Sequence, residues 1–307
     1  MYIPHKVMKK LARALYEFFK TVYPEYAGRG QRKYTIPQKA TLIALMFLLK
    51  AKWEDIPRIA YDFQEELELK DIPTFQDIND FYHKYLDPEK LEKEAETLAL
   101  LTIDLVGITE ISLACDSTGL RIADASRYYE QRAKKRAVFV KLHVMMETNT
   151  RVIISAEITD PKTGDITVLK EKFLPKIKEL IEKFRLSVKS FSADSAYDDE
   201  NVHAFLNALG VRDGIGIRKS GGGNPRSPLR RVLFRMRNLP WLRRLRGLRW
   251  VLESMFKVFK RLFGDVVRDR RVSGRPKGVW MRILLWNFIV LLSVSGLLLG
   301  FILTATL

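Results

Sequence analysis

Three carboxylates in this chain have positions that suit metal-dependent chemistry. Asp116 and Asp194 each follow a short apolar run that predicts a strand, and Glu253 lies on a predicted helix. Ligands bind at the ends of strands in an open α/β sheet, so two such aspartates and a glutamate from a facing helix can hold two divalent ions. Carboxylate oxygens suit Mg²⁺ or Mn²⁺. Two ions about 3.5–4 Å apart can activate a water or hydroxyl and stabilise the leaving oxygen of a phosphodiester.

Each carboxylate has a simpler interpretation when it is taken alone. An aspartate after a strand is commonly a turn residue or a helix cap. Glu253 stands among arginines and could serve only as their ion-pair partner. The catalytic interpretation is favoured by the order of the strands and by a spaced pattern around Glu253.

The spaced pattern is Arg249-x-x-x-Glu253-x-x-x-x-x-x-Lys260. On a helix, positions 249, 253, 257 and 260 lie close to one face. Glu253 can then bind a metal ion. Arg249, one turn before it, and Lys260, two turns after it, can bind the flanking phosphates.

This pattern resembles the Tyr-x-x-Arg-x-x-x-Glu-x-x-x-x-x-x-Lys signature of one group of DDE transposases from prokaryotic insertion sequences. The Arg, Glu and Lys of the signature match Arg249, Glu253 and Lys260. Arg246 stands at the position of the Tyr, a departure that removes an aromatic hydroxyl but leaves the metal-binding position unchanged.

The two aspartates have contexts similar to the other motifs of this family. Asp194, with Tyr197 three residues later, resembles the second Asp motif. Asp116, with Lys141 in the following strand, resembles the first. The resemblance covers roughly residues 106–290 and implies a ribonuclease-H-like fold. It implies catalytic metal ligands at Asp116, Asp194 and Glu253, and DNA or phosphate contacts from Lys141, Arg246, Arg249, Lys257 and Lys260.

The activity that the resemblance implies is DNA transposition. The enzyme would nick the ends of its element to free a 3′-OH, and this OH would attack target DNA at the same two Mg²⁺ or Mn²⁺ ions. The implied partners are terminal inverted repeats, target DNA and further copies of the chain. The chain would form a homodimer or a larger assembly and act in the cytoplasm. Two alternatives stay open. One is a structure-specific nuclease on the same fold. The other is an inactive DNA-binding or domesticated protein, which the departure from the signature at Arg246 leaves open.

The charge of the chain is concentrated in one segment. The formal net charge is +17, and residues 212–282 contain 21 basic and 4 acidic side chains, so the rest of the chain sums to zero. A focused positive field of this kind indicates a phosphate-bearing partner.

The composition excludes several other classes of protein. With 47% hydrophobic and 29% charged residues, the chain is globular rather than disordered. The single cysteine, Cys115, excludes a disulfide scaffold and a thiolate zinc cluster. The four histidines are well separated in the sequence, which argues against a histidine-rich metal site.

The first third of the chain has helical periodicity. Pro37 suits the first turn of a helix over 36–49, and Thr74 is a good N-cap for a helix that ends near Tyr85. The helices between 53 and 85 could form a helix-turn-helix, but residues 53–105 contain 5 basic and 15 acidic groups. Residues 1–52, with 11 basic and 2 acidic groups, are the better candidate for DNA contact. Helical packing or dimerisation is the alternative role.

The periodicity after residue 105 predicts a mixed α/β sheet with helices on its faces. Strands are expected over 108–115, 188–193 and 214–217, with a hairpin of strands over 137–146 and 150–159. Helices are expected over 166–184 and 198–209, the latter closed by Gly210. We expect residues 219–228 to be a flexible link, followed by a helix through about Phe263.

The C-terminal region contains an apolar run with no charge, residues 283–303. Its length would suit a transmembrane helix, but we favour a buried helix that packs on the core, because a DNA enzyme gains little from a membrane anchor. The expected domains are a helical domain over 1–105, a catalytic domain over 106–278 with its basic segment from 212, and an apolar helix within 279–307.

Overall fold

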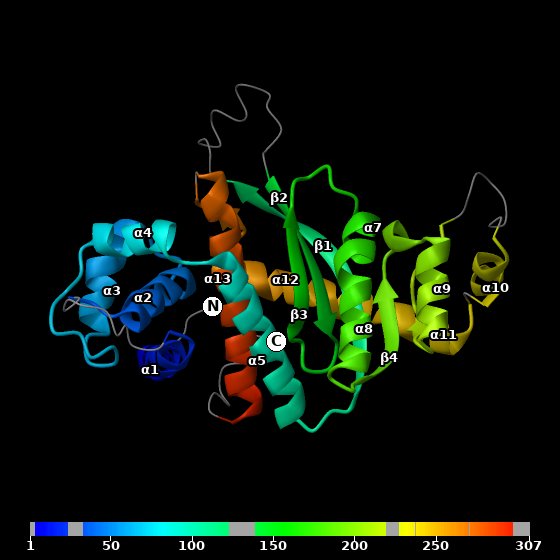
Figure 1. Cartoon of the computed structure of the whole chain (residues 1–307), viewed down its shortest axis with the longest axis horizontal. Helices are drawn as coiled ribbons and strands as arrows, with labels where there is room; N and C mark the ends of the chain where they lie inside the picture. Colours follow the sequence, from blue (N-terminus) through cyan, green and yellow to red (C-terminus); the bar gives the residue numbers. More distant parts are fainter. Residues whose placement is uncertain are drawn as a thin grey trace. The chain divides into compact units, whose positions relative to one another are not determined.

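The structure, a computed structural model, describes residues 4–23, 33–122, 139–218, 227–236, 238–269 and 271–296 (Figure 1). The chain forms two compact units. The first contains Met1–Ala95, Phe259–Asp265 and Asp269–Leu307, and the second contains Glu96–Val258 and Val266–Arg268. The domain boundaries expected near residues 105 and 278 stay a prediction.

The first unit is helical. Its elements are α1 (His5–Val22), α2 (Ile36–Leu48), the 3₁₀ turn η1 (Trp53–Asp55), α3 (Ile56–Asp62), α4 (Phe75–Lys84), the 3₁₀ turn η4 (Val272–Gly274) and α13 (Arg275–Val294). Helices α2 and α4 begin with capping boxes in which Thr35 and Thr74 accept from the third helical N–H. The start of α4 at the predicted N-cap, Thr74, is thereby confirmed.

Helix α13 is a core helix of this first unit. It packs on α2, and the ring of Phe288 lies 5.2 Å from that of Phe18. Nδ2 of the buried Asn287 donates to the carbonyl of Ala95 at 2.8 Å. The stretch Val272–Val294 is long and apolar enough to cross a membrane, yet 78% of its most apolar window is buried. The helix begins eight residues before the predicted apolar run, and residues 297–307 lie outside the described part of the chain.

The second unit contains a mixed sheet with the strand order β3-β2-β1-β4-β5, and β6 pairs with the end of β1. The strands are β1 (Glu110–Ile122), β2 (Phe139–Glu147), β3 (Ile153–Thr159), β4 (Ser187–Ala193), β5 (Arg212–Asp213) and β6 (Val266–Val267). Strands β1, β2 and β3 are antiparallel, whereas β4 is parallel to β1 and to β5. This arrangement confirms the predicted ribonuclease-H-like mixed sheet.

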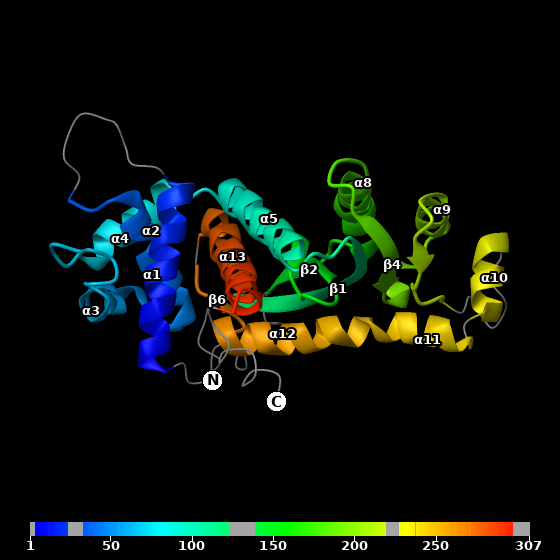
Figure 2. The same cartoon turned by 90° about the horizontal axis from the view of Figure 1, so that it is seen from below.

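Helices cover both faces of this sheet. The helices and helical turns in this part of the chain are α7 (Asp165–Val168), the π-helical η2 (Leu169–Phe173), α8 (Leu174–Glu182), the 3₁₀ turn η3 (Ser195–Tyr197), α9 (Glu200–Ala208), α10 (Pro228–Met236), α11 (Pro240–Gly247) and α12 (Arg249–Phe263). Helix α5 (Pro88–Leu105) leads into the sheet. Figures 1 and 2 show α8 and α9 on one face of the strands, with α11 and the start of α12 along the other.

Three predicted elements differ from the structure. Strand β1 does not end at Asp116 but continues to Ile122, because the residues that follow Asp116 remain paired with β2 as far as Arg121. The predicted helix over 166–184 contains a π turn just before Pro175, which has no N–H to donate back along the helix. The strand predicted over 214–217 is wrong: β5 is Arg212–Asp213, although later N–H groups still donate to β4. Most of the predicted link, residues 219–226, lies outside the described residues.

Candidate active site

The register of two parallel strands brings Asp116 and Asp194 together. The last residue pair between β1 and β4 is Cys115 with Ala193. Asp116 is the next residue of β1 and Asp194 is the residue directly after β4, so they lie side by side where β4 ends. Asp116 itself is in the middle of β1, opposite Val144 of β2, and a continuous strand therefore holds its backbone on one side.

Glu253 is joined to this strand end through Arg249. Nη1 of Arg249 donates to Oδ2 of Asp194 at 2.8 Å, and Nη2 of the same guanidinium lies 2.9 Å from Oε1 of Glu253. Arg249 is the first residue of α12, and Glu253 follows it by one turn, which is the spacing at which helical side chains meet. One cation thus bridges two of the three predicted carboxylates.

Asp116 belongs to the same electrostatic cluster. Burial raises the pKa of the Asp116 carboxyl, while the Ser117 N–H, which donates to Oδ1 at 2.8 Å, and the charge of Arg249 act in the opposite direction. The negative charges of Asp194 and Glu253 also raise this pKa. A carboxylate whose ionisation is opposed by burial and by two neighbouring negative charges marks a place that attracts a cation.

The donor set fits a pair of hard divalent ions. All three groups supply carboxylate oxygens, the ligands that Mg²⁺ and Mn²⁺ prefer. Among the residues that the structure describes, no three His, Cys, Asp or Glu side chains converge closely enough to hold an ion as they stand. The guanidinium of Arg249 lies between two of the carboxylates and partly neutralises them, so ion binding requires this side chain to move.

Helix α12 presents further predicted residues. Trp250, Glu253 and Lys257 are exposed and recur at helical spacing, so they share one face. Lys260 lies two turns after Glu253, in the part of α12 that clusters with the first unit. It is half-buried, and burial lowers the pKa of its ammonium, opposed by Asp265.

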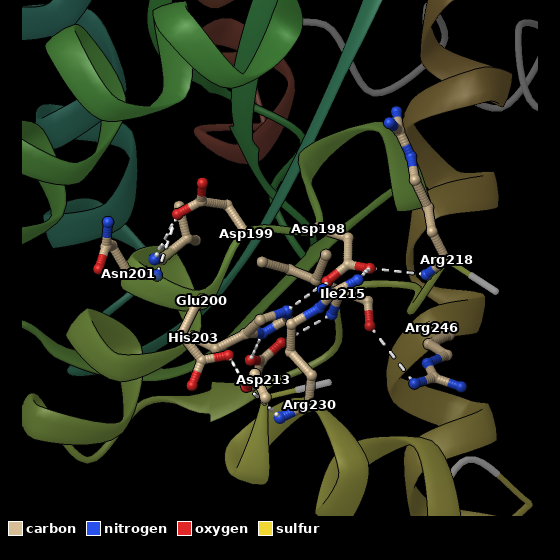
Figure 3. A network of polar contacts seen from close by, with 12 residues as sticks. Asp198, Asp199, Glu200, Asn201, His203, Asp213, Ile215, Arg218, Arg230 and Arg246 are labelled. Atoms are coloured by element: carbon tan, nitrogen blue, oxygen red, sulfur yellow. Dashed lines mark hydrogen bonds and ion pairs between the residues drawn. The ribbon is translucent and has the colours of Figure 1, made fainter. Parts of the chain in front are cut away.

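Arg246 makes an internal contact. Its Nη2 donates to the carbonyl of Ile215 at 3.4 Å, and Figure 3 shows the guanidinium directed at that carbonyl. The residue at the Tyr position of the signature therefore supports the backbone next to the strand end. Its predicted phosphate contact stays a prediction.

Lys141 lies on the opposite face of the sheet from Asp116. Its partner in β1 is Gly119, and side chains alternate between the faces along a strand, so positions 117 and 119 face away from position 116. Nζ of Lys141 forms an ion pair with Asp165 at 2.9 Å. The structure does not bring Lys141 to the other predicted residues.

Sequence reasoning missed a buried polar network beside Asp194. Asp198, His203, Asp213 and Arg230 are linked by hydrogen bonds and ion pairs. The available signal was the acidic run 198–200 directly after the turn that contains Tyr197, since an acid there must find a partner if it is buried. Asp165, which contacts Lys141, was missed as well.

Comparisons with known proteins identify one family. The family described as "Transposase DDE domain" matches residues 109–288, more than half of the chain, from the start of β1 into α13. None of the curated proteins matches the sequence.

Several solved structures are similar. A piggyBac transposase synaptic complex with hairpin DNA is 10% identical, with a TM-score of 0.42, over 94% of this chain and 73% of that one. The Mos1 strand transfer complex is 13% identical, with a TM-score of 0.30, over 91% and 84%. The Mos1 mariner paired end complex with Mn is 14% identical, with a TM-score of 0.25, over 94% and 87%.

Proposed function

The chain belongs to the transposase DDE domain family, and we propose on that premise that it cuts and joins DNA at the ends of a mobile element. The observation that carries the proposal is the placement of Asp116 beside Asp194, with Arg249 joining Asp194 to Glu253. These three acids come from two strands and a helix that are far apart in the sequence. The segment that contains Glu253, residues 212–282, carries the whole excess of positive charge.

Asp116, Asp194 and Glu253 would hold two Mg²⁺ or Mn²⁺ ions. When bound, such ions supply an activated oxygen nucleophile and stabilise the leaving oxygen of the phosphodiester. Arg249 exchanges its carboxylate partners for a phosphate of the bound strand, since guanidinium forms bidentate contacts with either group. Lys257, exposed one turn after Glu253, binds a neighbouring phosphate, and Lys260 is its predicted companion.

The surface around α11 suits DNA. Arg243 and Arg244 are exposed there, and Arg235 is exposed on α10. Trp241 and Trp250 are 44% and 64% exposed, although tryptophan usually buries most of its surface. Arginines with interspersed exposed aromatics can bind the backbone and stack on unpaired bases of a nucleic acid strand.

The finer parts of the proposal follow from the signature. Arg249, Glu253 and Lys260 at their spacing support assignment to the insertion-sequence group, despite Arg246. The DNA partners would be terminal inverted repeats and target DNA. We further propose a homodimer or larger assembly, because two element ends must be held together, and a cytoplasmic site of action.

A strand-transfer assay tests this function. The full chain is incubated with labelled element ends, a target plasmid and Mg²⁺ or Mn²⁺, and joined products are resolved on a denaturing gel. The proposal predicts labelled target DNA. Cleavage without joining would indicate a nuclease, and binding without cleavage would indicate an inactive DNA-binding protein; either result contradicts the proposal.

A further inference from the structure

A buried polar network lies directly behind the turn that carries Asp194, and the catalytic roles above do not use it (Figure 3). The side chains of Asp198 and His203 have no exposed surface. Buried charged groups are costly unless they are paired and hydrogen-bonded, so a network of this kind fixes the elements that contribute to it.

Asp198 is the hub of this network. Its Oδ1 accepts hydrogen bonds from Nε2 of His203 at 2.9 Å and from Nε of Arg230 at 2.7 Å. Its Oδ2 accepts from the backbone N–H of Arg218 at 2.7 Å and from the Arg230 guanidinium as well. Each carboxylate oxygen therefore accepts two hydrogen bonds, and the four donors come from three segments of the chain.

His203 extends the network to the short strand β5. Its Nδ1 contacts Oδ2 of Asp213, so its two ring nitrogens face two carboxylates. The other oxygen of Asp213 accepts the N–H of Ile215 at 2.8 Å. The network thus fixes the course of the chain through residues 213–218.

This fixed segment packs against the backbone of Asp194. The N–H of Gly216 donates to the carbonyl of Ala193 at 3.2 Å. A Cβ atom on Gly216 would lie 3.1 Å from the nitrogen of Ser195, so only glycine allows so close an approach without a shift. Within the turn, the N–H of Tyr197 donates to the carbonyl of Asp194 at 3.1 Å, and that of Asp198 donates to Ser195 at 3.3 Å.

We propose that Asp198 is the positioning residue for Asp194: it closes the turn from Asp194 and holds the 213–218 segment against it, so that the Asp194 carboxylate is presented to the metal ions. The inference rests on the proposed function. Arg230 lies on the basic helix α10 and donates hydrogen bonds to both oxygens of Asp198, so α10 is tied to the same network.

An Asp198→Asn substitution tests the role of the hub. The amide keeps the shape of the carboxylate, but its NH₂ group cannot accept the donors that face one oxygen, and the negative charge between His203 and Arg230 is lost. Loss of a partner that orients a metal ligand weakens metal binding by about 10–100-fold. We expect the Mn²⁺ affinity of the full chain, measured by electron paramagnetic resonance without DNA, to fall by about tenfold or more.

Asp199→Asn is the matched control. Asp199 is the next residue, caps α9 by accepting from Asn201 and Val202, and pairs with Lys170, and these described partners all lie outside the 213–218 segment. Its substitution should lower stability, as the loss of an N-cap does, and leave Mn²⁺ affinity within about twofold of wild type. A comparable loss of affinity in both variants would show that general destabilisation is responsible and would overturn the proposal.

Metal rescue distinguishes positioning from a structural role. Raising the Mn²⁺ concentration should restore DNA cleavage by Asp198→Asn but not by Asp194→Asn, which lacks the ligand itself. If Asp198→Asn does not fold, Arg230→Gln serves instead, because it removes two hydrogen bonds from a side chain that is 21% exposed. Unchanged Mn²⁺ affinity in the folded variant overturns the inference. Absence of Mn²⁺ binding or cleavage in the wild type would overturn the proposed function instead.

Discussion

Nη1 of Arg249 lies 2.8 Å from Oδ2 of Asp194, so the first residue of α12 is tied to the end of β4. The same guanidinium lies 2.9 Å from Oε1 of Glu253, so one arginine is shared by two of the three predicted carboxylates. The positive charge of Arg249 therefore lies against carboxylates to which the proposed function assigns divalent ions.

Arg249→Gln should strengthen Mn²⁺ binding in the absence of DNA. The arginine competes with the metal for Asp194 and Glu253, and partly exposed ion pairs of this kind are worth about 0.2–1 kcal/mol each. Loss of both pairs should therefore raise the affinity for Mn²⁺ by about 2- to 30-fold. DNA affinity should fall, since a phosphate contact is lost. Arg243→Gln, an exposed arginine of α11, is the control. Weaker Mn²⁺ binding by Arg249→Gln would show that the arginine assembles the site rather than competing for it.

Lys257→Ala should weaken DNA binding through the loss of one phosphate contact. The slope of log affinity against log salt concentration should decrease by about one. Lys178→Ala is the control, because Lys178 lies on α8, on the other face of the sheet, and pairs with Glu182. Fluorescence anisotropy over a salt series measures both slopes. Equal slopes for wild type and Lys257→Ala would contradict the contact.

Folding stability should depend on pH through His203. Hydrogen bonds and charges from Asp213 and Asp198 raise the pKa of the imidazole against the opposing effect of burial. The stabilisation by the charged ring is therefore complete below the unfolded pKa of about 6.5 and is lost as pH rises through the raised folded value.

Asp198 sets the lower end of the pH range in which this network stabilises the folded protein. Despite burial, hydrogen bonds from Arg230 and His203 lower the pKa of Asp198, so its contribution is present above the ordinary aspartate pKa and is lost as pH falls through the lowered value. Urea unfolding at several pH values should show the stability difference between wild type and His203→Gln shrinking as pH rises past neutrality. A difference independent of pH would mean that the pKa of His203 is the same in the folded and the unfolded protein.

The full chain should be recovered without detergent. Helix α13 is long enough to cross a bilayer, but its Arg282 and Asn287 are buried within the protein, and 78% of its most apolar window is covered. Ultracentrifugation of a cell lysate checks this, with the protein expected in the supernatant. Membrane partition that resists high salt and carbonate would contradict the position of α13 as a core helix.

Local patterns were sufficient to predict the elements that carry Asp194 and Glu253. The hairpin over 137–159 and the strand before Asp194 have short-range periodicity, and the capping residue Thr74 acts within its own turn. Helical spacing also placed Arg249 and Glu253 on one face of their helix, and in the structure the two side chains meet.

Long-range relationships could not be predicted in the same way. Asp116 is in mid-strand because β1 continues along β2 after β4 has ended, which depends on the pairing of three strands. Lys141 is directed to the opposite face by the register of the hairpin. The partners of Asp198 lie up to 32 residues away, so no local spacing indicates them.

The most direct test of the central claim is cleavage and joining of labelled element ends by Asp116→Asn, Asp194→Asn and Glu253→Gln, with DNA affinity measured on the same samples. If these carboxylates hold the catalytic ions, each variant should lose cleavage and strand transfer by about 10³-fold or more, while DNA affinity stays within a few-fold of wild type. Cleavage that survives in all three variants would show that the catalytic site lies elsewhere.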